Sequence, residues 1–115
     1  MELKQKNHLH KVAEAIEKTI HIKSNSIFYE QALKMFHKEL FNIVAHLNFD
    51  SEEYKIINEV VQTLHDVIHE TQDIYHYSII DDKGEHKHTT DRKGHIVGIL
   101  EWALDYIIGN IEVEE

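Results

Sequence analysis

Residues 50–75 read DSEEYKIINEVVQTLHDVIHETQDIY, and this stretch carries the clearest helical pattern in the chain. A mostly apolar stripe recurs along it at alternating spacings of three and four, as on one buried face of an α-helix. Its members are Tyr54, Ile57, Val61, Leu64, Ile68, Thr71 and Tyr75. Asp50 and Glu53 have the spacing of a capping pair at a helix start. The pattern predicts a helix over about residues 51–76.

The opposite face of this predicted helix is acidic. Carboxylates follow one another at intervals of seven residues, at Glu52, Glu59, Asp66 and Asp73. Residues seven apart lie on the same side of a helix, about two turns from each other. We therefore expect this face to point into solvent while the apolar stripe faces the core.

Other segments of the chain show helical periodicity as well. Residues 1–83 contain no glycine or proline. Two polar clusters, HIKSNS at residues 21–26 and NFDS at residues 48–51, supply Ser, Asn or Asp side chains that can cap the start of a new helix. The predicted helices span about residues 3–20, 27–47, 51–76 and 92–108. We expect one all-α domain over residues 1–115, built as a four-helix bundle.

A turn signal lies between the third and fourth predicted helices. Residues 81–84, DDKG, have the composition of a tight turn. They are flanked by YSII at residues 77–80 and EHKHT at residues 85–89. We expect a short hairpin or an ordered loop at this position, inserted into the bundle.

Composition excludes several classes of function. The chain has no cysteine, which excludes disulfide scaffolds, zinc fingers, iron–sulfur sites and cysteine nucleophiles. It carries 21 acidic and 12 basic residues, a net charge of −9 at pH 7, and such a chain repels the phosphate backbone of nucleic acids. No apolar run approaches the roughly 18 residues of a membrane span. We therefore expect a cytoplasmic protein that binds neither nucleic acid nor membrane.

The last predicted helix points to contact with a protein. It is apolar over about half its circumference, which is more than a surface helix needs. Small residues allow a second helix to approach, and aromatic residues anchor interfaces. The residues expected at this contact are His95, Gly98, Trp102, Tyr106 and Gly109. No nucleophile elbow, phosphate-binding loop or dinucleotide fingerprint is present, so the leading hypothesis is a non-enzymatic regulator, inhibitor or accessory subunit that contacts a protein partner or its own copy.

Histidines and carboxylates of the third predicted helix form a candidate metal site. His65 and His69 are four residues apart, a spacing by which one helix can chelate a divalent transition metal. Asp66, Asp73 and His76 are close to them in sequence. Imidazole and carboxylate ligands together suit Zn, Ni, Fe or Mn. The alternative is that these residues form a solvated polar face with no metal.

A short resemblance bears on the metal hypothesis. Residues 37–42, HKELFN, resemble the first ligand helix of bacterial hemerythrin-like bundles, and His69 with Asp73 resembles their His-x-x-x-Glu step with a shorter acid. The resemblance implies a diiron or other metal site that binds oxygen or buffers iron. The chain departs from the pattern at the third-helix His-x-x-x-His step, because His86 is followed four residues later by Thr90.

A second resemblance concerns residues 64–66. Their sequence, LHD, looks like the core of an HD-type phosphohydrolase, which implies a metal site for phosphoester hydrolysis with His37 and Asp105 in the outer positions. Asp66 departs from that role because it belongs to the acidic row expected to face solvent. Two alternatives thus stand beside the contact hypothesis: a helical bundle that binds a transition metal, and an acidic mimic of nucleic acid.

Overall fold

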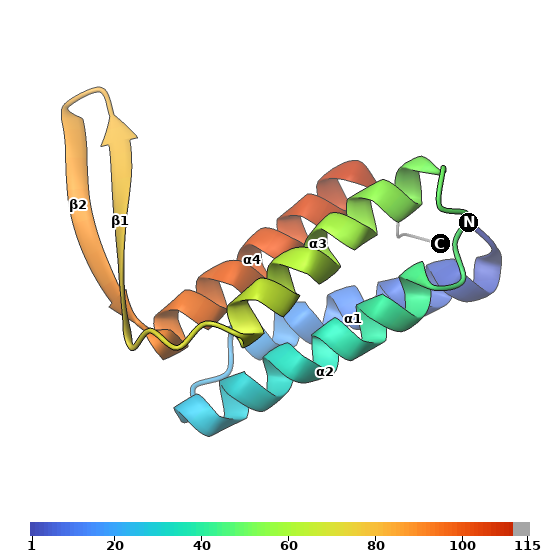
Figure 1. Ribbon diagram of the computed structural model, residues 1–115, viewed down its shortest axis with the longest axis horizontal. Coiled ribbons are helices and arrows are strands. Elements are labelled where there is room, and N and C mark those ends of the chain that lie inside the picture. The colour runs from blue at the N-terminus through green and yellow to red at the C-terminus, as the bar shows by residue number, and fades with distance from the viewer. Residues whose placement is uncertain (112–115) are drawn as a thin grey trace.

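The computed structural model describes residues 1–111 and contains four helices and one β-hairpin (Figure 1). In chain order the elements are α1 (Leu3–Ile20), α2 (Ser26–Val44), α3 (Glu52–Ile68), β1 (Ile74–Asp81), β2 (Gly84–Asp91) and α4 (Arg92–Asn110). The helices pack into one helical body, and the hairpin projects from one end of it. The prediction of an all-α fold is therefore wrong, because two eight-residue strands form an antiparallel sheet between α3 and α4.

All four helices contribute to one apolar core. Helices α1 and α3 each pack against α2 and α4, and α2 also contacts α4. The largest fully buried side chains include Leu9, Ile16, Leu33, Phe36, Leu40, Ile57, Leu64, Ile96, Leu100 and Ile107. Burial of one such side chain stabilises the fold by roughly 1.5–3 kcal/mol. Among residues 1–111, no helix combines the length and apolar character required to cross a membrane.

Three helices begin at a side-chain cap. Asn25, Ser51 and Asp91 each accept a hydrogen bond from the backbone N–H three residues later, before α2, α3 and α4 respectively. Each cap satisfies an N–H group that has no partner within the helix. The cap of α3 is Ser51 and not the Asp50 expected from the sequence.

Helix α3 ends at Ile68 and not near residue 76 as predicted. After Ile68 the chain leaves the helix and turns outward into the arm (Figure 1). Of the next apolar residues, Tyr75 packs on His95 of α4 from its place in β1. Residues 74–80, IYHYSII, are rich in β-branched and aromatic types, which favour a strand.

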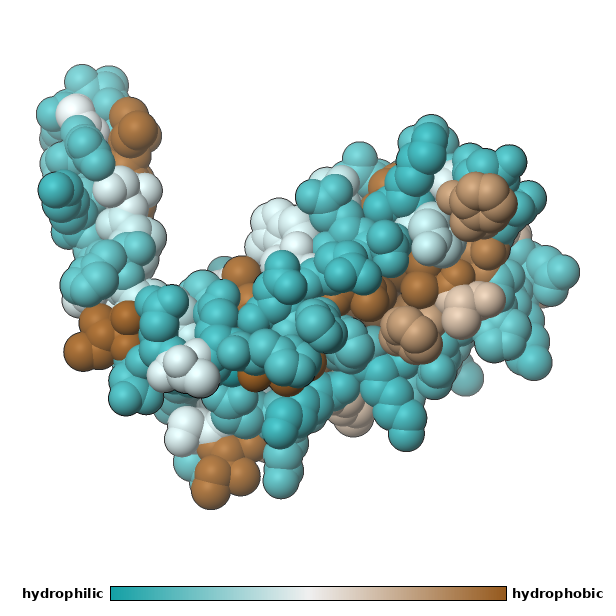
Figure 2. Space-filling model, in the orientation of Figure 1, coloured by the Kyte–Doolittle hydropathy of each residue, from teal (hydrophilic) through white to brown (hydrophobic). Residues whose placement is uncertain are grey.

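The hairpin, which we call the arm, comprises residues 74–91. Its strands pair in register from Ile74 with Asp91 to Asp81 with Gly84. Gly84 closes the turn with a φ of +115°, a conformation that side chains other than glycine rarely adopt. Figure 2 shows the arm standing clear of the helical body. The arm is therefore a projecting element and not a layer of the core.

Candidate functional site

The arm joins the helical body through a polar cluster around Arg92, the only arginine in the chain. Because Asp91 caps α4, Arg92 is the first residue of that helix and follows directly after β2. Its Nε and Nη2 atoms donate hydrogen bonds to the two carboxylate oxygens of Glu30 on α2, at 2.5 and 3.1 Å. Its Nη1 atom donates to the hydroxyl of Tyr75 at 2.8 Å. One side chain thereby connects α2, β1 and α4.

The pair between Arg92 and Glu30 is partly shielded from water, with 15% and 32% of the two side chains exposed. Two parallel hydrogen bonds to a carboxylate are a strong arrangement for arginine. The hydrogen bond from Arg92 lowers the pKa of Glu30, against the smaller effect of burial. The same bond raises the pKa of Arg92. Both groups therefore stay charged at neutral pH.

A ring stack forms the second contact at the junction. His95 lies about one turn after Arg92 on α4 and stacks on Tyr75, with ring centroids 3.8 Å apart and planes 7° from parallel. Its Nε2 atom is 3.4 Å from Oε2 of Glu70, and both atoms are buried without a hydrogen-bond partner. Burial lowers the pKa of His95, while the Glu70 carboxylate opposes this shift and Arg92 adds to it. A neutral His95 ring is therefore favoured in the folded protein.

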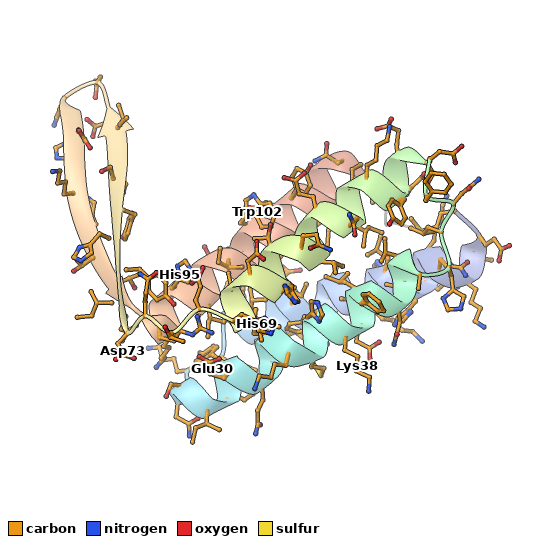
Figure 3. The ribbon with its side chains drawn as sticks, viewed as in Figure 1. Glu30, Lys38, His69, Asp73, His95 and Trp102 are labelled. Atoms are coloured by element: carbon orange, nitrogen blue, oxygen red, sulfur yellow. The ribbon has the colours of Figure 1, made fainter. Side chains whose placement is uncertain are left out.

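The junction holds the arm in one direction. Figure 3 shows Glu30 on α2 and His95 on α4, both near the base of the hairpin. Tyr75 is the one strand residue that is buried, and it contacts both Arg92 and His95. A two-stranded hairpin is marginally stable in water by itself. The contacts at its base therefore decide where the arm points.

Beyond its base the arm exposes large side chains. The exposed fractions are 46% for Tyr77, 47% for Ile79 and 79% for Ile80. Tyr77 lies opposite His88, and their rings stack with centroids 5.4 Å apart. Clustered apolar side chains on a projecting element are typical of surfaces that contact another molecule. The arm is thus a candidate contact element that the sequence analysis did not identify.

The residues of α4 expected at a contact lie in two environments. His95 belongs to the junction, whereas Trp102 and Tyr106 are half-buried farther along the helix and stack at 5.3 Å between centroids. A Cβ atom placed on Gly98 or Gly109 would meet no atom within 4 Å. These glycines are not points of close helix packing within the described chain. They leave open surface on α4, the helix that carries the aromatic pair.

Histidines of α2 and α3 lie side by side on the helical body. The ring centroids of His65 and His69 are 4.3 Å apart, and His37 on α2 lies 5.9 Å from His65. Two imidazoles bound to one tetrahedral zinc ion would have centroids about 5 Å apart, given metal–nitrogen distances of about 2.0–2.1 Å. Nδ1 of His69 is 2.8 Å from the carbonyl oxygen of His65, which leaves Nε2 free for a metal. The observed 4.3 Å is shorter than this, so the two rings are close neighbours that would have to move slightly apart to bind one ion.

His37 is the member of this group that sequence spacing did not find, because it comes from a different helix. Burial lowers its pKa, and positive charge on His65 and His69 lowers it further. Both family resemblances involved His37, but spacing along one helix could not place it beside His65 and His69.

The other expected metal ligands lie elsewhere. Asp66 is 3.6 Å from the His65 ring but is mostly exposed. Asp73 lies in the connection after α3, and His76 lies in β1, so the helical spacing that placed them beside His69 does not exist. Among residues 1–111, no three His, Asp or Glu side chains are arranged to hold a metal ion.

Of the residues behind the two family resemblances, His37, His65 and His69 lie near one another, whereas His86 and Asp105 do not join them. His86 lies in β2 and not on a helix, and Asp105 is on the exposed side of α4. Comparison with protein-family models, curated proteins and solved structures finds no match for this chain. Inference about function therefore depends on the arm, its junction and the histidine pair.

The partners of Arg92 could not be predicted from the sequence. Arg92 is the chain's only arginine and stands at the start of the last predicted helix. Its partner Glu30 is 62 residues away in the chain. No spacing rule within a helix or a hairpin connects residues so far apart.

Proposed function

We propose that this chain is a small cytoplasmic protein that acts by contact with another protein, as a regulator, inhibitor or accessory subunit, and that the arm is its contact element. The observation that carries this proposal is a hairpin that exposes Tyr77, Ile79 and Ile80 while Arg92 fixes its base. Burying such side chains against a partner is favourable. An arm already held in place also loses less conformational entropy on binding.

Two further features support a protein partner. The surface of α4 with Trp102 and Tyr106 offers aromatic side chains of the type that dominates binding energies at interfaces. The net charge of −9 favours a partner whose facing surface is basic, because opposite charge speeds association. Neither feature requires an enzymatic activity.

Site-specific photo-crosslinking tests the proposal. A photoreactive residue at position 80, near the tip of the arm, is expected to give discrete protein adducts in cells that produce the chain. The matched control is the same residue at Glu59, an exposed position on α3. Absence of adducts from position 80, or equal adducts from both positions, would overturn the proposal.

A second candidate function is transition-metal binding by His65 and His69. The 4.3 Å separation of their rings is the observation that favours it. Two imidazoles would provide part of the coordination sphere, and water would complete it. Binding requires neutral rings, so it should weaken as pH falls through the histidine range. Calorimetric titration of the parent protein and of His69→Ala with nickel or zinc tests it.

A further inference from the structure

The outer edge of β2 is an open strand edge. The sheet has only the order β1–β2, so each strand has one side without a strand partner. Figure 1 shows β1 on the side of the arm toward the helices and β2 on the side away from them. Along such an edge, alternate residues direct unpaired N–H and C=O groups outward. A further strand can therefore reach β2 without meeting the helical body.

Two strands are few for an element that projects so far. Isolated two-stranded hairpins are marginal in water, and three or more strands are needed for independent stability. Apart from Tyr75 at its base, the arm buries none of its strand residues against the helical body. Additional strands would supply the stability that its own contacts do not.

The charges on β2 select a particular partner. Glu85 and Lys87 are both exposed and, being two residues apart, project from the same face of the strand. If a second β2 runs antiparallel with His86 opposite His86, then Glu85 of each copy lies opposite Lys87 of the other. Opposite charges across a strand pair stabilise it, and like charges destabilise it.

Other registers lose this complementarity. In the register above, the two-fold axis that relates the copies passes between the two His86 residues. An axis at residue 85 places Glu85 opposite Glu85, and an axis at residue 87 places Lys87 opposite Lys87. Moving it to residue 88 places Glu85 opposite Asp91. The edge therefore matches a second copy of itself in one register and disfavours the neighbouring ones, which is how charges specify strand pairing.

We propose that two copies of this chain join through their β2 edges into a four-stranded antiparallel sheet of order β1–β2–β2–β1, centred on His86. The proposal rests on the proposed function, since it names a second copy as the partner of the arm. The two-fold axis makes the contact isologous, as in most homodimers. The two helical bodies lie at opposite ends of the sheet, where neither obstructs the other arm.

Charge reversal tests this pairing in the full chain. Sedimentation analysis should find a dimer for the parent protein. Lys87→Glu and Glu85→Lys should each weaken dimerisation by about tenfold or more, because two attractive pairs become repulsive. An equimolar mixture of the two variants should dimerise again, since each copy then meets opposite charge. The double variant E85K/K87E should also dimerise.

Controls separate this effect from loss of folding. Lys38→Glu changes the net charge by the same amount as Lys87→Glu, but on the exposed surface of α2. It should leave dimerisation unchanged. Circular dichroism should show the same helical content for every variant. A monomeric parent, a dimer insensitive to Lys87→Glu, or a mixture that stays monomeric would overturn the pairing. A monomeric parent whose arm still crosslinks to other proteins would overturn this inference alone and leave the proposed function standing.

Discussion

The imidazole of His95 lies flat against the ring of Tyr75, with centroids 3.8 Å apart, and this stack closes the contact between α4 and the arm. Beside it, Nε2 of His95 and Oε2 of Glu70 are buried 3.4 Å apart without a hydrogen bond. The junction thus combines a hydrogen-bonded arginine pair with a half-buried histidine whose neutral form is favoured. The Arg92–Glu30 pair and His95 should therefore respond differently to pH and to mutation.

The first prediction concerns pH. Burial lowers the folded-state pKa of His95 and of His37 below the ordinary value of 6.5. As pH falls through 6.5, the unfolded chain therefore binds more protons than the folded chain. The free energy of unfolding should be highest above this range and should fall as pH decreases toward the folded-state pKa values. The lowered pKa of Glu30 adds a further loss below 4.5.

Urea unfolding midpoints measured from about pH 7.5 to about pH 5 check this slope. The double variant His37→Gln/His95→Gln should have a flatter profile than the parent. His46→Gln, which changes an exposed histidine on the connection after α2, is the control and should keep the parental slope. A parental midpoint that rises as pH decreases would contradict the prediction.

The second prediction concerns Arg92. Lysine keeps the charge but cannot form the two parallel bonds to Glu30, so Arg92→Lys should lower the free energy of unfolding by about 1–2 kcal/mol. Amide hydrogen exchange should become faster in the arm than in the core helices. Lys55→Ala removes an exposed pair with Glu52 at 3.6 Å and should cost less than about 1 kcal/mol. Equal effects of the two substitutions would show that the junction contributes no more than a surface pair.

The third prediction tests the histidine pair. Calorimetric titration of untagged protein with nickel or zinc should show a saturable phase that disappears in His69→Ala. His46→Ala is a close control, because Nδ1 of His46 lies 2.8 Å from the Asn42 carbonyl as that of His69 lies from the His65 carbonyl. His46 has no histidine four residues before it. Identical isotherms for the two variants would rule out a chelate at His65 and His69.

The fourth prediction compares two glycines. A Cβ atom at Gly98 meets open space in the middle of α4, so Gly98→Ala should stabilise the protein by about 0.5–1 kcal/mol through helix propensity. Gly84→Ala should destabilise the arm by about 1 kcal/mol, because its φ of +115° disfavours a side chain. Thermal unfolding of both variants checks the signs. A destabilised Gly98→Ala would show that a partner or a second copy already packs closely on α4.

Local sequence determined much of the helical body. The apolar periodicity of residues 3–20 and 92–108 predicted α1 and α4 closely, because a helix buries residues at fixed local spacing. The two polar clusters within residues 1–83 supplied the caps of α2 and α3, since capping involves only neighbouring residues. The turn at residues 81–84 was also readable from its own composition. Each of these features depends on a few consecutive residues.

Tertiary structure decided where α3 ends and which element comes after it. The spacing of Thr71 and Tyr75 continues the helical stripe, so periodicity alone extends the helix to residue 76. In the folded chain Tyr75 instead lies in β1, where it stacks on His95 of α4, and residues 74–80 pair with β2. Arg92 likewise meets Glu30 from 62 residues away. Local spacing cannot encode such contacts, because they exist only once separate helices have packed and brought distant residues together.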